Sequence, residues 1–399
     1  MTLGLYISVP FCRTKCSYCN FASDVFSRAT YENYVSRVLD DIAKAAETAS
    51  EVGCILTETV DSIYLGGGTP SILDPDQLRR IFGALKERFS VVSHTEITVE
   101  CAPGTLTPVL IETLLECGVN RVSLGVQSFV DQEAQSVGRL HKRATVLEEI
   151  AGLRRAGIGN INIDLIAGLP HQTDQSWTLS LSETIATGVP HVSVYMLEVD
   201  EDSRLGRELI AGGTRYHAHF VPDEEVTADF YLQACGSLNA TGIAQYEISN
   251  FARRGCESRH NLKYWTRQPY LGFGVDAHSM LLARDLPGVK SVRFSTPDSL
   301  DAYMNRGPRA VTPVLAHGAL EENFFLGLRL NRGVDLEGLR SDFSRESIAA
   351  CELAIKECVQ AGLLERRGTR VCLTDRGRLL SNEVFAKFLT DEGVGAKSG

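Results

Sequence analysis

The sequence has no uninterrupted apolar run of roughly 18 residues or more, although 44% of its 399 residues are hydrophobic. A helix that spans a membrane needs about 20 such residues, so a transmembrane protein is not expected. The first residues, Met-Thr-Leu-Gly-Leu-Tyr, also lack the basic region and the small-residue cleavage site of a secretory signal. We therefore expect a globular, cytoplasmic protein.

Basic residues are fewer than acidic residues in this sequence. The chain has 40 Lys and Arg against 50 Asp and Glu, which gives a formal net charge of −10, and it has no dense basic stripe. This balance argues against nucleic acid or an anionic membrane as the main partner. The sequence also lacks the G-x-x-x-x-G-K-[ST] phosphate loop, which excludes a P-loop nucleoside triphosphatase, and it shows no internal repeat.

The chain has 11 cysteines, but in a long cytoplasmic protein their thiols are expected to stay reduced. Seven of them stand among apolar neighbours and are predicted to be small core residues. These seven are Cys54, Cys101, Cys117, Cys235, Cys351, Cys358 and Cys372. Cys256 lies in a polar run and is not assigned. Only Cys12, Cys16 and Cys19 have the spacing of metal ligands.

The first half of the chain alternates short β-branched runs with helix-like segments. The predicted strands are Leu3–Val9, Val60–Leu65, Glu96–Glu100, Arg121–Gly125, Asn160–Ile166 and His191–Leu197. The predicted helices are Tyr31–Thr48, Pro75–Phe89, Thr107–Cys117, Ala144–Ala156 and Asp174–Thr187. Repeated βα units predict an α/β protein with a parallel sheet covered by helices. The even spacing of the strands favours a barrel or partial barrel, in which site residues gather at the carboxyl ends of the strands.

Unusual residues do follow these strands in order. The cysteine cluster comes after the first predicted strand, and Gly66-Gly67-Gly68-Thr69-Pro70 comes after the second. Glu100 ends the third, Gln127 follows the fourth, and Asp164 lies inside the fifth. Because parallel strands end on the same rim, these features are predicted to converge on one site.

Length predicts more than one domain. We assign residues 1–200 to the barrel, 201–310 to a linker and sheet-extending segment, and 311–399 to a mostly helical C-terminal domain. In the last of these, two short strands around Arg367-Gly368 follow a helix, which suggests a winged-helix-like module.

Three cysteines are too few for a structural zinc site, which takes four protein ligands, and the nearest later histidine is His94. A [4Fe–4S] cluster is held by thiolates, and three of them leave one iron open. The C-x3-C-x2-C spacing after the first strand resembles that of the radical S-adenosylmethionine (SAM) superfamily, whose fold is a partial (βα)6, TIM-like barrel. The resemblance implies that Cys12, Cys16 and Cys19 hold the cluster. The open iron would then chelate SAM, and an electron from the cluster would cleave it to a 5′-deoxyadenosyl radical.

A closer resemblance, to the oxygen-independent coproporphyrinogen III oxidase-like family, covers nearly the whole chain. It rests on "YLGGGTPS", "ECAP", "RVSLGVQSF", "GRLH" and "NIDLIAGLPHQT". It implies SAM contacts at Tyr6, Gly67, Gly68, Thr69, Glu100, Gln127, Arg139 and Asp164. By themselves, the glycines indicate a tight turn, and Glu100 can simply cap a strand end. Asp164 lies in an apolar strand, where a buried carboxylate needs a partner.

Two features resemble the haem-chaperone (HemW) subgroup of that family. The oxidases carry a further cysteine two positions after the third, where this chain has Phe21. The run "HNLKYW" matches an H-N-x-x-Y-W motif, and the resemblance implies that His260 binds haem. A histidine beside Tyr264 and Trp265 suits a flat iron porphyrin, but it could equally be a hydrogen-bonded corner of the domain junction. Other candidate iron ligands are His278, His217 and His219. Asp276 stands where the family is expected to have glycine.

Three functions are compatible with these residues. The first is a haem chaperone that binds haem, a [4Fe–4S] cluster and SAM and passes haem to an acceptor protein, with the cluster acting as a lock or promoting a homodimer. The second is a radical enzyme that acts on a tetrapyrrole, for example by oxidative decarboxylation of coproporphyrinogen III, with a flavodoxin or ferredoxin as electron donor. The third, an electron-transfer iron–sulfur protein, is disfavoured because an open iron is exposed to oxidation. The sequence alone leaves open whether the chain is an enzyme.

Overall fold

The structure is a computed structural model that describes residues 1–198 and 200–389. Six parallel strands form the centre of the molecule, in the order in which they occur in the chain. They are β1 (Leu3–Val9), β2 (Thr59–Gly67), β3 (Ser90–Cys101), β4 (Arg121–Gln127), β5 (Asn160–Ala167) and β6 (His191–Met196). All six predicted strands are confirmed, and only their ends differ. Within the described residues, no helix is both long and apolar enough to cross a membrane.

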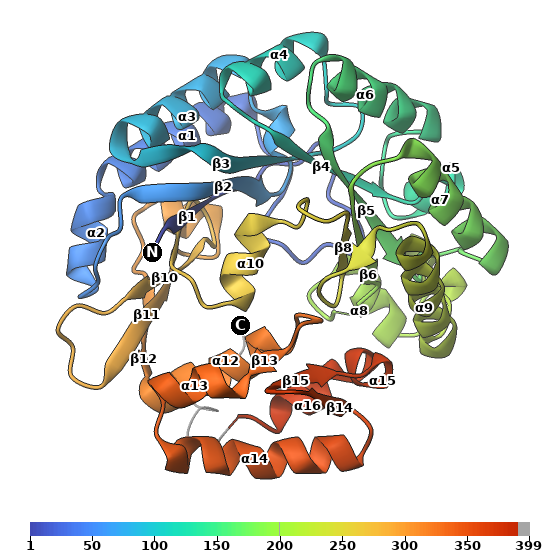
Figure 1. The fold of residues 1–399 in the computed structure, drawn as a ribbon. Helices are drawn as coiled ribbons and strands as arrows, with labels where there is room; N and C mark the ends of the chain where they lie inside the picture. The colour runs from blue at the N-terminus through green and yellow to red at the C-terminus, as the bar shows by residue number, and fades with distance from the viewer. Residues whose placement is uncertain (199, 390–399) are drawn as a thin grey trace.

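Helices cover the outer face of these strands (Figure 1). They are α1 (Arg28–Ala43), α2 (Ala45–Glu51), α3 (Pro75–Arg88), α4 (Pro108–Glu116), α5 (Asp131–Ser136), α6 (Arg143–Arg155) and α7 (Asp174–Thr187). Several begin at a side chain that accepts a hydrogen bond from the first turn, as Ser27, Thr107 and Thr173 do. The predicted helix 31–48 is divided at Lys44, and the six-residue α5 was not predicted.

The strands alternate between an apolar outer face and a polar inner face. In β1, Leu3, Leu5, Ile7 and Val9 are fully buried in the main core, whereas Tyr6 lines an interior cavity. This alternation follows from the two-residue period of a strand. In closed TIM barrels branched apolar side chains fill the interior. Here the polar inward positions surround cavities, so the barrel interior is available as a site.

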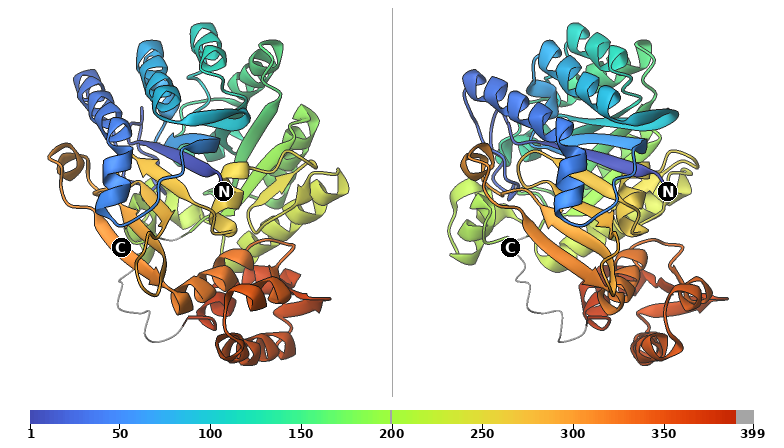
Figure 2. Two further views of the ribbon diagram at one scale, coloured as in Figure 1. Left: turned by 60° about the vertical axis from the view of Figure 1, so that its left-hand side comes forward. Right: turned by 90° about the vertical axis from the view of Figure 1, so that its left-hand side faces the viewer.

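Both edges of the parallel sheet are extended by later strands. At one edge, β8 (Asn250–Ala252) pairs antiparallel with β6, followed by β7 (Ala244–Gln245). At the other edge, β9 (Tyr270–Phe273) pairs parallel with β1. Next come β10 (His278–Leu282), β11 (Val289–Ser295) and β12 (Ala310–Leu315). The described residues thus form one twelve-stranded sheet, which curves around the interior as a partial barrel (Figures 1 and 2).

One helix lies inside the barrel. This is α10 (Arg259–Trp265), which carries the HNLKYW run and occupies the middle of the ring in Figure 1. It packs against the amino-terminal parts of β1 and β2. A Cβ placed on Gly4 would lie 2.8 Å from Lys263 and 3.3 Å from His260, and the Ser62 hydroxyl lies 3.1 Å from Nδ1 of His260. The remaining helical segments of this region are α8 (Arg204–Ile210), η2 (Arg215–Phe220), α9 (Glu224–Ala240) and α11 (Leu300–Met304), and η1 (Pro70–Ile72) lies earlier in the chain.

The C-terminal unit has a core of its own, which includes Phe324, Ile355 and Val371. Its helices are α12 (Ala316–Gly327), α13 (Leu336–Asp342), α14 (Arg345–Gln360), α15 (Asp375–Leu379) and α16 (Ser381–Ala386). Its small sheet has the order β13 (Val334–Asp335), β15 (Arg370–Leu373), β14 (Leu364–Arg367). The two strands predicted around Arg367-Gly368 are therefore present. Residues 390–399 of the predicted third domain lie outside the described residues, and the predicted boundaries at 200 and 310 stay predictions.

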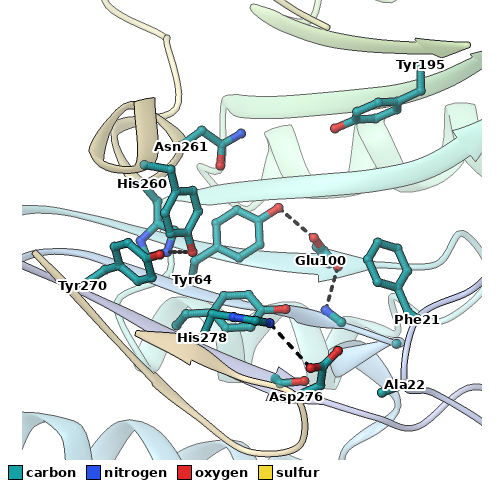
Figure 3. A pocket seen from close by; sticks show the side chains of 15 residues that line it. Phe21, Ala22, Tyr64, Glu100, Tyr195, His260, Asn261, Tyr270, Asp276 and His278 are labelled. Carbon is teal, nitrogen blue, oxygen red and sulfur yellow. Dashed lines mark hydrogen bonds and ion pairs between the residues drawn. The ribbon is translucent and has the colours of Figure 1, made fainter. Parts of the chain in front are cut away.

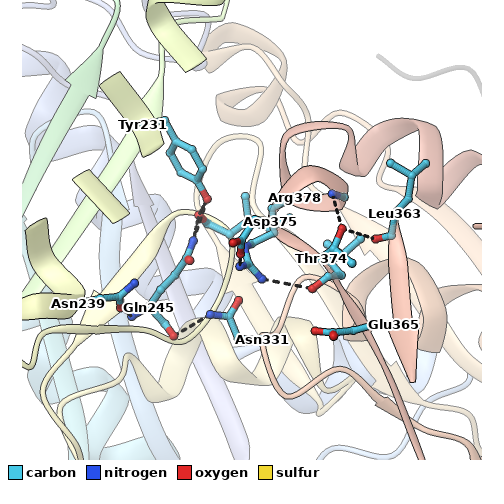
Figure 4. Close-up of polar contacts among 12 residues, drawn as sticks. Tyr231, Asn239, Gln245, Asn331, Leu363, Glu365, Thr374, Asp375 and Arg378 are labelled. Atoms are coloured by element: carbon cyan, nitrogen blue, oxygen red, sulfur yellow. Dashed lines mark hydrogen bonds and ion pairs between the residues drawn. The ribbon is translucent and has the colours of Figure 1, made fainter. Parts of the chain in front are cut away.

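The C-terminal unit is joined to the barrel by backbone and side-chain contacts (Figure 4). The Asn331 amide donates to the Gln245 carbonyl at 2.8 Å, and the Gln245 amide donates to the Tyr231 hydroxyl at 2.7 Å. The Arg329 guanidinium lies 4.5 Å from the centre of the Trp265 ring on α10. The helix inside the barrel is thus also in contact with the C-terminal unit.

The cysteines outside the N-terminal loop are largely structural. Five of the seven predicted core cysteines are buried, whereas Cys235 and Cys351 are only partly buried. For Cys235 and Cys351 the prediction of a fully buried core position is wrong, because both side chains lie at the partly exposed side of a helix. Cys256 is also partly buried.

Candidate functional site

The cysteine loop is fixed at the carboxyl end of β1 by neighbouring elements. The Cys12 amide donates to the Asp24 carbonyl at 3.0 Å, which closes the loop on itself. The Ser17 amide donates to the Val137 carbonyl at 3.1 Å, and the Leu205 amide donates to the Ser17 carbonyl at 2.7 Å. The loop is therefore anchored both to the end of α5 and to α8, which holds its thiols at the rim of the barrel.

The three thiols open onto a cavity of about 530 Å³ that extends from the cysteine loop to the C-terminal unit. The structure brings most of the predicted site residues to this cavity. They are Cys12, Cys16, Cys19, Gly67, Gly68, Thr69, Glu100, Gln127, Arg139 and Asp164. Tyr6 and His260 instead line a neighbouring cavity.

Cys12, Cys16 and Cys19 line one cavity, and thiolates are the ligands that a [4Fe–4S] cluster takes, each on a different iron. In the part of the chain that the structure describes, no three His, Cys, Asp or Glu side chains are placed as ligands of a single metal ion. The Thr69 hydroxyl, 3.7 Å from the Cys12 sulfur, can donate to that sulfur. Such a cluster, when bound, would supply an electron and one open iron.

The glycine run brings backbone close to the cysteine loop. Gly67 has φ +101°, and its amide donates to Glu100 Oε2 at 3.2 Å. A Cβ on Gly68 would lie 2.7 Å from the Phe11 carbonyl oxygen and 2.8 Å from that of Val9. Because both oxygens belong to the backbone that leads into Cys12, only glycine fits there.

Glu100 is a partly buried carboxyl in the wall shared by the two cavities. It accepts hydrogen bonds from the Tyr64 hydroxyl at 2.8 Å and from the Gly67 amide. Burial raises the pKa of Glu100 to about 7, and the nearby Asp164 adds to the shift. A cationic ligand in the cavity would favour its ionised form.

Asp164 has the partners that its apolar strand requires. Its carboxylate accepts from the Ser123 hydroxyl at 3.1 Å and from the Asn162 amide at 2.7 Å. Asn162 in turn contacts His191 at 2.6 Å, so the carboxylate belongs to a network spanning β4, β5 and β6. Burial raises the pKa of Asp164 in spite of these hydrogen bonds.

Two arginines border the same cavity with unused donors. The Arg139 guanidinium donates to the Tyr18 hydroxyl at 3.0 Å, but its Nε is buried without a partner among the described residues. Arg121 is only 2% exposed, and its Nε is likewise buried without a hydrogen-bond partner among the described residues. Buried donors normally have acceptors, so these guanidinium groups fit a ligand with a carboxylate. Carboxylates, arginines and the glycine backbone together suit an amino acid with a cationic group.

The neighbouring cavity, of about 500 Å³, is aromatic (Figure 3). We call it the aromatic cavity; among its lining residues are Tyr6, Phe21, Tyr64, Tyr195, His260, Tyr264, Tyr270, Asp276 and His278. Seven residues line both this cavity and the cluster-side cavity: Phe21, Tyr64, Gly67, Gly68, Glu100, Tyr195 and Asn261. The two cavities are therefore contiguous, and a second, flatter ligand could lie beside the first.

His260 forms part of the base of the aromatic cavity. The side chain is 1% exposed, with Nδ1 3.1 Å from the Ser62 hydroxyl and Nε2 2.8 Å from the Tyr264 hydroxyl. Burial lowers the pKa of His260 to about 3, so the ring is neutral. His217 and His219, on η2, are exposed and line neither cavity; His217 contacts His171 at 3.1 Å.

Comparison with known proteins places this architecture in a family. Residues 6–181 match the radical SAM superfamily, and residues 316–380 match the HemN C-terminal domain. "Heme chaperone HemW" of Bacillus subtilis is 33% identical over 391 residues, which cover 96% of this chain and 98% of that protein. The chain belongs to the HemW family of the radical SAM superfamily.

Other relatives agree with this membership. "Heme chaperone HemW" of Lactococcus lactis is 32% identical over 97% of each chain. The bovine "Radical S-adenosyl methionine domain-containing protein 1, mitochondrial" is 30% identical, over 92% of this chain and 83% of its own. The solved structure of coproporphyrinogen III oxidase (HemN) from Escherichia coli, a radical SAM enzyme, matches with a TM-score of 0.80. It covers 97% of this chain and 90% of its own, and at 22% identity it supports the fold alone.

For a HemW-family chain, the superfamily implies a [4Fe–4S] cluster and SAM, and the site geometry fits both groups. Sequence reasoning missed several residues that complete the site, namely Tyr64, Arg121, Ser123, Asn162 and Tyr195. A signal for Arg121, Ser123 and Asn162 is present in the sequence. Polar residues alternate with Val, Ile or Leu over Arg121–Leu124 of β4 and Asn160–Leu165 of β5. Such alternation in a parallel sheet indicates an inner face that is not packed.

Proposed function

We propose that this protein is a haem chaperone, which binds haem beside a [4Fe–4S] cluster with SAM and passes the haem to an acceptor protein. The observation that carries the proposal is the aromatic cavity, which is contiguous with the cavity of the cysteine loop. Its volume of about 500 Å³ is within the range of ordinary ligand pockets. The names of the HemW relatives point in the same direction.

The chemistry of the aromatic cavity suits a flat, largely apolar macrocycle. Tyr6 and Tyr64 are stacked with their centroids 6.1 Å apart, and Tyr264 meets Tyr270 edge-on at 4.5 Å. His260 and Asn261 line this cavity from α10. Arg329, from the C-terminal unit, lines the adjoining cavity and has an unpaired Nε among the described residues, which suits a haem carboxylate.

On the cluster side, we propose that Cys12, Cys16 and Cys19 hold the cluster. SAM would be held by Gly67, Gly68, Thr69, Glu100, Gln127, Arg139 and Asp164, together with Tyr6, which lines the aromatic cavity. The same proposal includes an acceptor protein for the haem, a flavodoxin or ferredoxin as electron donor, a homodimer and a cytoplasmic location. Light scattering of the protein with and without its cluster tests the dimer.

The proposal is tested with anaerobically reconstituted protein titrated with haem. We expect one haem to bind per chain, measured by the Soret absorbance of protein-bound haem. That haem should then be transferred to a haem-free globin, which is used as the acceptor probe. If cluster-loaded protein binds no haem, the proposal is wrong.

A second candidate is a radical enzyme that acts on a tetrapyrrole. It is favoured by one observation: all the implied SAM contacts except Tyr6 line the same cavity as the three thiols. Against it, Phe21 replaces the additional cysteine of the oxidases, and its side chain reaches both cavities. An anaerobic assay with dithionite, SAM and coproporphyrinogen III separates the two, because formation of protoporphyrinogen would overturn the chaperone proposal.

A further inference from the structure

We propose that His278, oriented by Asp276, supplies the protein ligand to the iron of the bound haem; this inference rests on the proposed function. Asp276 stands just before β10, and His278 is the first residue of that strand. Both line the aromatic cavity, and Figure 3 shows the His278 ring directed at the Asp276 carboxylate. The pair therefore comes from the sheet extension, and not from the α10 motif.

Accessibility separates His278 from His260. An iron ligand needs a ring nitrogen that the metal can reach, and the His278 side chain is 68% exposed. His260 is 1% exposed, and both of its nitrogens are within hydrogen-bonding distance of hydroxyl groups. Binding iron at His260 would break one of these buried hydrogen bonds and leave the Ser62 or Tyr264 hydroxyl without its partner. Among the described residues, neither ring nitrogen of His278 is hydrogen-bonded, so coordination there breaks no such bond.

Asp276 has the position of a carboxylate that orients a metal-binding histidine. A histidine ligand commonly donates its second ring N–H to a carboxylate, which fixes the ring and makes it more basic. Here Oδ1 of Asp276 is 3.6 Å from Nε2 of His278, so a small rotation completes the contact and leaves the other nitrogen for iron. Asp276 is held in a left-handed conformation, φ +52°, by a hydrogen bond from its amide to the Pro297 carbonyl at 2.8 Å.

The other residues of the aromatic cavity then contact the porphyrin ring and do not bind the iron. The Tyr6, Tyr64 and Tyr270 rings can pack against the porphyrin. His260 keeps its hydrogen bonds and contacts the porphyrin by packing from the base of the cavity. The assignment explains how the buried, neutral histidine of α10 can be part of a haem site without breaking its own network.

The experiment compares single variants of the full-length, cluster-loaded protein titrated anaerobically with haem. Absorption, EPR and resonance Raman spectra report the axial ligand independently of activity. We expect His278→Ala to lose the iron–histidine signature and to bind haem about tenfold more weakly or worse, with the signature restored by added imidazole. His317→Ala, an exposed histidine on α12 outside both cavities, is the matched control and should match the wild type.

Two further variants sharpen the result. Asp276→Asn should keep the histidine ligand but lower the iron–histidine stretching frequency, because the amide accepts the ring proton less strongly than a carboxylate. His260→Ala should keep the iron–histidine signature even if affinity falls. If His278→Ala keeps a wild-type signature, or if His260→Ala alone removes it, the inference is overturned while the chaperone proposal stands. If the wild-type protein binds no haem at all, both fail.

Discussion

Replacing Gly68 by alanine tests how the glycine run and the cysteine loop depend on each other. The added methyl group would lie 2.7 Å from the Phe11 carbonyl oxygen and 2.8 Å from the Val9 carbonyl oxygen. These are backbone atoms and cannot rotate away. Both also accept hydrogen bonds, at 2.7 Å from the Thr69 amide and at 2.8 Å from the Gly68 amide. The loop must therefore move by several tenths of an ångström, and Cys12 moves with it.

The magnitude follows from these contacts. Overpacking of this kind costs about 1–3 kcal/mol, and each of the two weakened backbone hydrogen bonds costs about 1 kcal/mol, so we expect a loss of about 3–5 kcal/mol in the free energy of unfolding. Gly83→Ala is the matched control. Gly83 lies inside α3, and an added Cβ there meets nothing within 4 Å. That change should stabilise the helix by about 0.5–1 kcal/mol.

Urea unfolding of the cluster-free protein under anaerobic, reducing conditions measures the free energy; tryptophan fluorescence follows the barrel through the buried Trp177. Iron content and visible absorbance after reconstitution measure the site. Gly68→Ala should lose stability and hold less iron, whereas Gly83→Ala should hold as much iron as the wild type. Equal stability and equal iron content in Gly68→Ala would refute the close-approach argument.

Three further outcomes are expected. SAM should bind up to about tenfold more tightly at pH 8 than at pH 6, because the Glu100 carboxyl, with a pKa of about 7, must ionise to face a cation. Calorimetric titration should find this rise absent in Glu100→Gln, and a wild-type affinity independent of pH would contradict the assignment. Cys16→Ala should abolish the intact cluster. Cys256→Ala removes a partly buried cysteine outside the loop and should leave the iron content unchanged. Equal iron content in the two variants would contradict the assignment of the cluster to the cysteine loop. Arg329→Ala should cost about 1–2 kcal/mol, because its guanidinium lies 4.5 Å from the Trp265 ring centre, and unchanged urea unfolding would show that this contact does not stabilise the junction.

Much of the candidate site could be predicted from the sequence because its signals are local. The spacing of Cys12, Cys16 and Cys19 and the glycine run are both short motifs. The strands before them could be predicted from their β-branched residues. Parallel strands in a barrel end on one rim, so the order of the strands was enough to predict that these features meet.

The aromatic cavity could not be predicted in this way, because its walls come from distant parts of the chain. Tyr6 is in β1, Tyr195 is in β6, and Tyr270 follows the helix inside the barrel. No local pattern states that α10 enters the barrel, since this depends on how the sheet is extended at both edges. For the same reason, the sequence motif favoured His260 over His278, His217 and His219, but no local pattern could show which of these rings has a free nitrogen in a cavity.

The sequence by itself determined the six βα units, the cysteine loop and the acidic and glycine residues of the rim, since each follows from local spacing and strand periodicity. Only the tertiary structure decided which of these side chains share a cavity and which are already occupied by hydrogen bonds. His260 illustrates the difference. Its motif is visible in the sequence, but the Ser62 and Tyr264 hydroxyls that surround its ring come into contact with it only when α10 packs inside the barrel.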